Sequence, residues 1–347
     1  MAYTAINKST DYFSTKLYTG TGADNNAITG IGHQPDWVWI KSRSGTHSAG
    51  VHEWYDSVRG TGKMISSNQT NAEATGTNRL KSFDSDGYTF GDHNQINGGS
   101  TNYVSWNWKA GTTSGITTTG ADITPSYYSM SATSGISIIK FTGNGVDGAK
   151  IAHGLGAVPE MIISKRLENS NYWAVYHKLD NTDYFVLNTN DASSDAPLWK
   201  DTNPTSVYYQ TDSSTSVNPS SETVVAYCFK SVTGFSKIGS YTGTNGLNFI
   251  YTGFKPKWCM FKRKDSGDNW KILDSDRSTF NIMNETLSAD TSSAEGTESD
   301  VYVDFLSNGI RLDGSNGAIN ASGGTYIYMA FAEAPLVGSN NVPCTAR

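Results

Sequence analysis

"PKWCMFK" occupies residues 256–262, and two earlier stretches repeat its plan: "PDWVWIK" (35–41) and "PEMIISK" (159–165). In each, a lysine follows the proline by six residues. Side chains alternate between the two faces of a strand, which puts Trp258 and Met260 on one face and Cys259 and Phe261 on the other. Both faces are apolar. The pattern predicts a β-strand covered on both sides, by a partner sheet on one and by a loop or neighbouring domain on the other.

Further anchors recur in the same order around these strands. An aromatic-Thr-Gly turn opens each copy, at residues 18–20, 141–143 and 241–243. Each copy closes on an aromatic or β-branched strand whose first residue follows an asparagine by six positions: Asn97 before "YVSWNW" (103–108), Asn218 before "VVAYCF" (224–229) and Asn320 before "YIYMAF" (326–331). Two independent registers that agree across three copies indicate a threefold internal repeat.

The repeat predicts three tandem domains in an all-β chain. Turn residues such as Asp86-Gly87 and Asn308-Gly309 separate the strands, and two packed antiparallel sheets, a β-sandwich, are the expected architecture of each copy. We expect the first sandwich and an N-terminal arm in 1–110, a Gly/Ser/Thr-rich linker in 111–134, the second sandwich in 135–232, and the third with a C-terminal tail in 233–347.

Composition supports this class and limits the partners. The 347 residues include 35 glycines and 12% aromatics but only 17% charged residues, and long stretches with helical spacing are absent. The N-terminus lacks an apolar signal region and no run is long enough to span a bilayer, so we expect a soluble product made in the cytoplasm, without membrane insertion. Three cysteines (Cys228, Cys259, Cys344) form no CxxC motif, and we interpret the first two as small buried hydrophobes.

The third copy carries the most basic stretch, "GFKPKWCMFKRKDSGDNW" (253–270). Basic residues interleaved with aromatics also occur in nucleic-acid-binding strands, but a formal net charge of −6 argues against nucleic acid as a partner. Lys262 has counterparts in the other copies and therefore belongs to the scaffold. Lys255, Lys257 and Lys264 are peculiar to this copy and are the predicted partner-binding residues, on a basic rim that would dock on an acidic neighbour.

No motif predicts catalysis, a cofactor or a metal. Asp84/Asp86 and Asp274/Asp276 are close carboxylate pairs of the kind a glycosidase needs, but "FDSDG" (83–87) is more simply a turn whose aspartates cap backbone amides. The same stretch lacks the remaining ligands of a calcium loop. His47 and His52 stand five residues apart, which misses the helical spacing of paired zinc ligands, and we expect the histidines at the surface or in turns. We therefore predict that the protein is not an enzyme and has no cofactor.

Two features leave ligand binding open. Asp56/Arg59 and Asp274/Arg277 share an Asp-x-x-Arg spacing that could hold a ligand carboxylate or sugar, although such a pair more often ties a loop to a strand end. Tyr127, Tyr128 and Trp199 could contact a sugar if they are exposed, and are otherwise packing residues.

Several stretches of the first copy together carry a resemblance: "INKSTDYFSTKLYTGTG", "GIGHQPDWVWIKSRS", "WYDSVRGTGKMISSN", "LKSFDSDGYTFG" and "NGGSTNYVSWNWKAG". They resemble a repeat domain of tailed-bacteriophage virion proteins of the marine-phage tail-fibre or tail-associated type, which is similar to concanavalin-like or SPRY-like sandwiches. The second and third copies match as divergent versions. The resemblance implies a jelly-roll or concanavalin-like form of the sandwich and a structural or adhesive role in the virion, and it supplies no site residues.

From this resemblance we expect a non-enzymatic, surface-exposed virion protein. The preferred prediction is a tail fibre, receptor-binding or tail-associated component. A capsid decoration protein that stabilises the head is the alternative, because the sequence lacks heptads and an obvious shaft. A polysaccharide-degrading enzyme is a third class with little weight. The expected partners are other virion proteins, further copies of the chain, and a host-surface glycan or protein receptor.

Overall fold

The computed structural model describes residues 3–47, 49–338 and 343–345. It is an all-β chain with several antiparallel sheets, and the two α-helices, α1 (Asn94–Asn97) and α2 (Gly317–Asn320), have one turn each. Short 3-10 turns lie at Ser9–Asp11 and Pro197–Trp199. Helix is thus a minor part of the structure, which agrees with the absence of long stretches with helical spacing in the sequence. In the part of the chain that is described, no helix has the length and apolarity to cross a membrane.

Three main sheets share one strand order. In each, the first strand of the copy pairs with the last, the last with the proline-led strand, and that strand with the next along the chain. The first main sheet is β1-β9-β3-β4, built from β1 (Phe13–Thr19), β9 (Asn102–Trp108), β3 (Trp37–Ser44) and β4 (Glu53–Asp56). The second is β10-β11-β18-β13-β14-β15-β16, built from β10 (Tyr127–Ser131), β11 (Ile136–Thr142), β18 (Thr223–Phe229), β13 (Met161–Arg166), β14 (Ala174–His177), β15 (Asp180–Val186) and β16 (Ser194–Asp195). The third is β19-β27-β21-β22-β23-β24, built from β19 (Ser236–Thr242), β27 (Thr325–Pro335), β21 (Phe254–Arg263), β22 (Lys271–Asp274), β23 (Glu285–Ser288) and β24 (Gly296–Thr297).

Each main sheet has a smaller sheet beside it. These are β2-β8-β7, with β2 (Asn26–Thr29), β8 (Gly87–Phe90) and β7 (Leu80–Asp84); β12-β17, with β12 (Ala149–Ala152) and β17 (Tyr208–Thr211); and β20-β26-β25, with β20 (Leu247–Tyr251), β26 (Gly309–Asp313) and β25 (Val303–Leu306). A further ribbon pairs β5 (Lys63–Met64) with β6 (Ala74–Thr75). We call the parts that build the main sheets the first (13–108), second (127–229) and third (236–335) segments.

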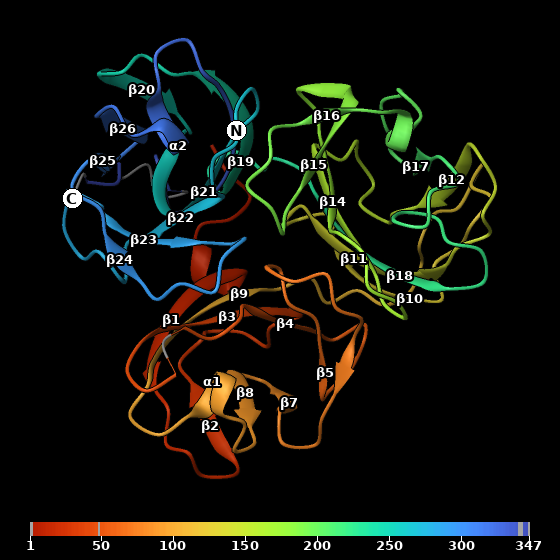
Figure 1. Ribbon diagram of the computed structural model, residues 1–347, viewed down its shortest axis with the longest axis horizontal. Coiled ribbons are helices and arrows are strands. Elements are labelled where there is room, and N and C mark those ends of the chain that lie inside the picture. Colours follow the sequence, from red (N-terminus) through yellow and green to blue (C-terminus); the bar gives the residue numbers. More distant parts are fainter. Residues whose placement is uncertain (1–2, 48, 339–342, 346–347) are drawn as a thin grey trace.

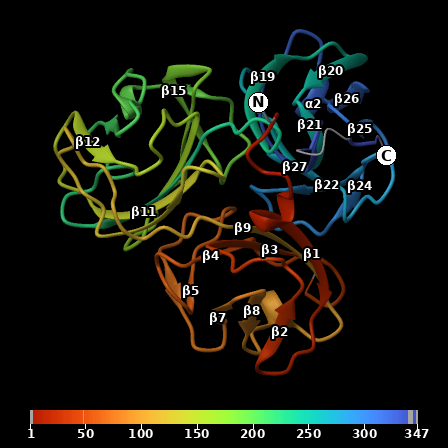
Figure 2. The same cartoon turned by 180° about the vertical axis from the view of Figure 1, so that it is seen from behind.

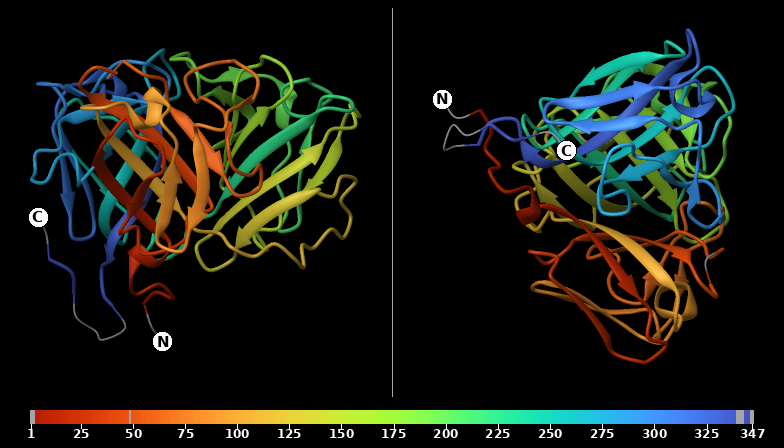
Figure 3. Two further views of the ribbon diagram at one scale, coloured as in Figure 1. Left: turned by 90° about the horizontal axis from the view of Figure 1, so that it is seen from below. Right: turned by 90° about the vertical axis from the view of Figure 1, so that its left-hand side faces the viewer.

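The three segments surround a common centre, with the main sheets on the inside and the smaller sheets on the outside (Figure 1; seen from behind in Figure 2). The stretches before β1 and after β27 lie on the same side of this ring (Figure 3). Residues 111–134, predicted as a linker, contain β10, which pairs in register with β11 from Tyr127↔Lys140 to Ser131↔Ile136. Part of that stretch is therefore an edge strand of the second main sheet.

The proline-led strands are buried on both faces, as predicted. Trp37 and Trp39 of β3 face an apolar cluster that all three segments share, and Val38 and Ile40 face a cluster formed with β2, β7 and β8. In β21, Trp258 and Met260 belong to the shared cluster, whereas Cys259 and Phe261 belong to a cluster of the third segment alone. The neighbouring segments thus cover the face of each strand for which the sequence predicted a loop or a neighbouring domain.

Two recurring sequence anchors have local structural causes. Asn97 donates its side-chain amide to the Ala23 and Gly91 carbonyls at 2.8 Å each, and Asn320 does the same to Gly246 (2.7 Å) and Gly314 (2.8 Å). The asparagine thus joins two loops ahead of the last strand. The glycine of each aromatic-Thr-Gly turn lies so close to backbone that an added Cβ would meet a carbonyl oxygen at 2.2 Å, at Gly20, Gly143 and Gly243. No other residue fits there.

Candidate functional site: three polar seams and one cleft

The lysine that ends each proline-led strand crosses to a neighbouring segment. Lys41 Nζ donates to the Ser292 carbonyl (3.3 Å), Lys165 to Thr70 (3.1 Å) and Lys262 to Asn190 (3.0 Å). All three lysines are fully buried. The first segment therefore reaches the third, the second reaches the first, and the third reaches the second. We call the three contacts the 1–2, 2–3 and 3–1 seams; together they close the ring.

Backbone hydrogen bonds repeat the same cyclic pattern. The Glu73 amide donates to the Leu167 carbonyl (2.7 Å) in the 1–2 seam. The Ser193 amide donates to Lys264 (2.9 Å) in the 2–3 seam, and the Glu295 amide donates to Arg43 (3.0 Å) in the 3–1 seam. Arg43, Leu167 and Lys264 thus occupy one equivalent position.

An aromatic N–H donor forms the next tie in each seam. The indole N–H of Trp173 donates to the Ser66 carbonyl (2.8 Å), and that of Trp270 to Val186 (3.0 Å). In the 3–1 seam the donor is His52, whose Nε2 lies 3.0 Å from the Ser288 carbonyl oxygen.

His52 corrects a sequence expectation. It is buried, not at the surface, and it takes the place that Trp173 and Trp270 hold in the other segments. Its Nδ1 accepts the Trp39 indole N–H at 2.8 Å, so Nε2 carries the hydrogen. Burial lowers the pKa of His52 well below its ordinary value, which keeps the ring neutral.

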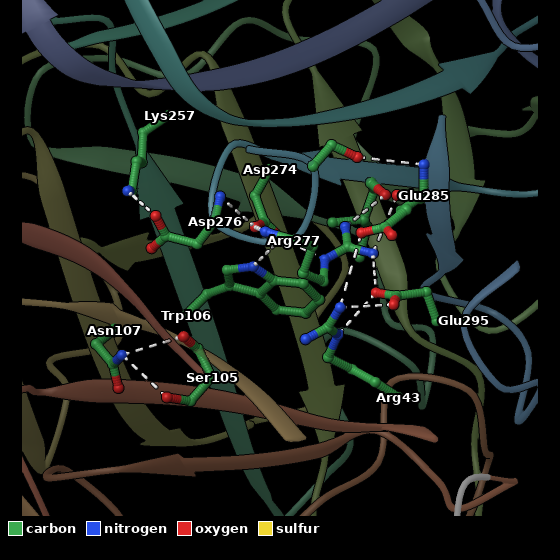
Figure 4. Close-up of polar contacts among 12 residues, drawn as sticks. Arg43, Ser105, Trp106, Asn107, Lys257, Asp274, Asp276, Arg277, Glu285 and Glu295 are labelled. Atoms are coloured by element: carbon green, nitrogen blue, oxygen red, sulfur yellow. Dashed lines mark hydrogen bonds and ion pairs between the residues drawn. The ribbon is translucent and has the colours of Figure 1, made fainter. Parts of the chain in front are cut away.

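The Asp-x-x-Arg pairs lie inside two of the seams, with side chains 0% exposed. Asp274 accepts from Arg277 Nε (2.5 Å) and, across the 3–1 seam, from the Trp106 indole (3.0 Å; Figure 4). Although burial alone raises the pKa of Asp274, the Arg277 guanidinium holds it below its ordinary value. Asp56 likewise accepts from Arg59 (2.6 Å) and from the Tyr227 hydroxyl across the 1–2 seam (2.6 Å). These pairs join segments and are closed to ligands.

Charges at the equivalent position of Arg43, Leu167 and Lys264 differ between the seams. Arg43 donates to both carboxylate oxygens of Glu295, at 2.9 and 2.7 Å (Figure 4). Lys264 pairs with Asp180 (3.1 Å) and Asp183 (2.8 Å) of the second segment. The 1–2 seam has the apolar Leu167 instead, so among the described residues two seams contain cross-segment ion pairs and the 1–2 seam contains none.

The lysines predicted to bind a partner are therefore already paired. Lys264 does meet an acidic neighbour, but that neighbour is the second segment of the same chain. Lys255 pairs with Glu333 at 3.0 Å, and Lys257 pairs with Asp276. The predicted basic rim is neutralised within the chain, and the three lysines form no free positive surface.

The other candidate groups have structural partners. Asp86 accepts the Gly30 and Gly32 amides (2.9 and 2.7 Å) and Asp84 accepts the Thr89 hydroxyl (2.8 Å), which confirms the interpretation of this stretch as a turn. Within the described residues, no three His, Cys, Asp or Glu side chains gather as they would around a metal ion. Trp199 is buried in the second segment, where it packs.

A cleft open to solvent brings several of the candidate residues together. It has a volume of about 720 Å³ and lies beside the 1–2 seam, between the loops around β3 and β4 and the start of β10. Tyr127 and Tyr128 line it, together with His33, Asp36 and Lys109. The Tyr127 side chain is 60% exposed. The sequence pointed to both tyrosines, but nothing in it placed the loops of the first segment opposite them.

The buried lysines lead to a prediction on pH. Burial lowers the pKa of Lys41 to about 7 and the pKa values of Lys165 and Lys262 to about 8, from an unfolded value near 10.4. Between these values the unfolded chain binds more protons, so the free energy of unfolding should rise with pH from about 7 to 9.5, by up to about 1.4 kcal/mol per pH unit for each lysine. Urea unfolding across this range measures the slope.

Lys262→Met should flatten that slope, because it removes one of the three buried amines. Lys178→Met removes a lysine that is 39% exposed and serves as the matched control. Equal slopes in the wild-type protein and in Lys262→Met would contradict the assignment.

Comparison with known proteins identifies the family. A search of curated proteins found no match. A family model described as a domain of unknown function, DUF7483, matches residues 8–335, which covers the three main sheets and all three seams. The chain therefore belongs to the DUF7483 family.

Proposed function

We propose that the protein is a non-enzymatic structural component of a bacteriophage particle, exposed on its surface, and in the first place a tail fibre, receptor-binding or tail-associated protein. The resemblance of the first copy to virion repeat domains suggests this role. The observation that carries this proposal is the closure of the ring. The buried lysines that recur in the repeat, Lys41, Lys165 and Lys262, each donate a hydrogen bond to a neighbouring segment. Such a unit suits a load-bearing or ligand-presenting part.

We further propose that each segment is a β-sandwich repeat, with the boundaries predicted from the sequence except that β10, in the predicted linker, belongs to the second repeat. The apolar clusters between each main sheet and its smaller sheet support this view. In a particle with several copies of the chain, rigid sandwich loops would multiply weak contacts by avidity.

A capsid decoration protein is the second candidate. The described residues form a compact ring and include no extended shaft of the kind a fibre needs, which favours a head accessory (Figure 3). Under both proposed roles, the partners of the protein are other virion proteins.

Electron cryomicroscopy of the particle, with an antibody against the protein as a label, tests the proposal. We expect density for the ring on the tail or its fibres. Density confined to the capsid lattice would select the decoration role, and absence of the protein from purified particles would overturn both. Release of reducing ends from host polysaccharide by the purified protein would overturn the non-enzymatic assignment.

A further inference from the structure

The cleft beside the 1–2 seam has the size and composition of a ligand site. Its volume of about 720 Å³ falls within the range of small-molecule sites, about 300–1,000 Å³. It depends on residues 109–128, which follow the first segment and lead into the second. The third segment follows the second through only a few residues (230–235), so the chain has no equivalent stretch at the 2–3 seam.

Tyr127 supplies an aromatic surface. The residue is 60% exposed at the start of an edge strand, and Lys140, directly opposite in the register, places its ammonium 4.5 Å from the ring centroid. This contact orients the ring and puts a positive charge beside it. Flat aromatic faces with polar neighbours are suited to the apolar face of a sugar ring.

Two lysines lie in or beside the cleft: Lys109 in its wall and Lys140 at the Tyr127 ring. Neither Lys109, in the cleft wall, nor Lys140 has an ion-pair partner among the residues that the structure describes. Asp36 is the acid in the wall, and three donors of the chain already occupy it: Ser57 Oγ (2.7 Å), Ser129 Oγ (2.8 Å) and the Ala110 amide (2.9 Å). Neutral donors thus surround the Asp36 carboxylate, and the charged hydrogen-bond donors that remain for a ligand are Lys109 and Lys140.

The cleft wall also contains an unused hydrogen-bond acceptor. His33 Nδ1 lies 2.9 Å from the Thr10 carbonyl oxygen and must donate to it, which leaves a lone pair on Nε2. That atom is buried and has no partner within the described chain. Burial lowers the pKa of His33, so the ring is neutral near pH 7 and Nε2 is an acceptor. An orphaned buried acceptor of this kind marks a place for an ordered water in the cleft wall.

From these features we propose that the cleft binds a carboxylated saccharide, with the Tyr127 ring under a sugar face and Lys109 and Lys140 near the carboxylates. The inference rests on the proposed function, in which the cleft would be the place where the particle contacts an acidic polysaccharide of the host surface. One seam forms the cleft, so one site per chain is expected.

Binding of the full chain to polygalacturonate oligosaccharides tests the inference, with the methyl-esterified oligosaccharides as an uncharged probe of the same backbone. Isothermal titration calorimetry should detect the acidic probe and give at least tenfold weaker binding of the ester. Tyr127→Ala should weaken binding of the acidic probe at least tenfold, and Lys109→Gln should weaken the acidic probe more than the ester.

Tyr208→Ala is the matched control, because Tyr208 also lies on a strand of the second segment with a lysine, Lys150, 5.5 Å from its ring, but outside the cleft. It should bind as the wild-type protein does, and circular dichroism should show that all variants are folded. Equal losses in Tyr127→Ala and Tyr208→Ala, equal affinity for both probes, or no binding of the acidic probe would each overturn the inference. Failure of the proposed function is separate: a chain that binds the acidic probe but is absent from the particle removes the virion role and leaves the cleft.

Discussion

Replacing Arg277 by methionine is expected to lower the free energy of unfolding by about 3–5 kcal/mol. The substitution leaves Asp274 buried in the 3–1 seam without its counter-ion, and it removes one of the two guanidinium groups that hold Glu295 (Figure 4). An uncompensated buried carboxylate is far more costly than the loss of a surface ion pair. Equilibrium unfolding in urea, followed by far-ultraviolet circular dichroism, measures the change.

Arg311→Met is the matched control for this prediction. Arg311 also pairs with two aspartates, Asp304 and Asp313, but its side chain is 42% exposed, and we expect a loss below about 1 kcal/mol. Adding Asp274→Asn to Arg277→Met should restore part of the stability, since it removes the unpaired charge. If the two single arginine variants lose equal stability, the seam pair does not have the role assigned to it.

The second large effect concerns the shared core. Trp258→Ala is expected to cost about 3–5 kcal/mol and to shift one cooperative transition of the whole chain. The Trp258 ring centroid lies 5.7 Å from that of Trp108 and 6.3 Å from that of Trp39, both in the first segment, and 6.0 Å from that of Phe331 in its own. Loss of this ring therefore opens a cavity between segments, not inside one.

Differential scanning calorimetry and tryptophan fluorescence test this prediction together. Both should report one transition, with the calorimetric enthalpy equal to the van't Hoff enthalpy, in the wild-type protein and at lower temperature in Trp258→Ala. Phe280→Ala, at a side chain that is 79% exposed, should change stability by less than about 0.5 kcal/mol. Separate transitions, of which Trp258→Ala shifts only one, would mean that the segments unfold independently.

Local features of the fold could be predicted from the sequence because they have local causes. Alternation in "PKWCMFK" gives a strand buried on both faces, and the spacing of Asn320 from the last strand reflects a side chain that joins two loops. Turn chemistry also identified Asp86 as a backbone cap. Each of these depends on residues within a few positions or on one strand.

The seams were beyond sequence reasoning because their partners lie in other segments. The recurrence of Lys41, Lys165 and Lys262 indicated a scaffold role, but the carbonyl that each lysine reaches follows no pattern in the sequence. Comparison of the three copies did not relate His52 to Trp173 and Trp270, because an imidazole replaces an indole as the N–H donor. Lys264 was predicted to be free because its partners, Asp180 and Asp183, belong to another segment and lie about eighty residues earlier in the chain.

Only part of the candidate cleft could be predicted from the sequence. Tyr127 and Tyr128 were notable as aromatics in a polar stretch, and the exposure of Tyr127 agrees with a role outside the core. No sequence pattern indicated that His33 or Lys109 belongs to a ligand site, because their loops face β10 only in the closed ring.

The closed ring has an evolutionary consequence. A symmetric homotrimer built from one such segment would have three identical interfaces, and every mutation would appear in all of them at once. Here one gene encodes all three, so Leu167 can stand in one interface where Arg43 and Lys264 stand in the others, and an insertion can shape a single cleft. Covalent linkage also makes ring closure independent of protein concentration, because the three parts meet as neighbours on one chain and not as separate molecules.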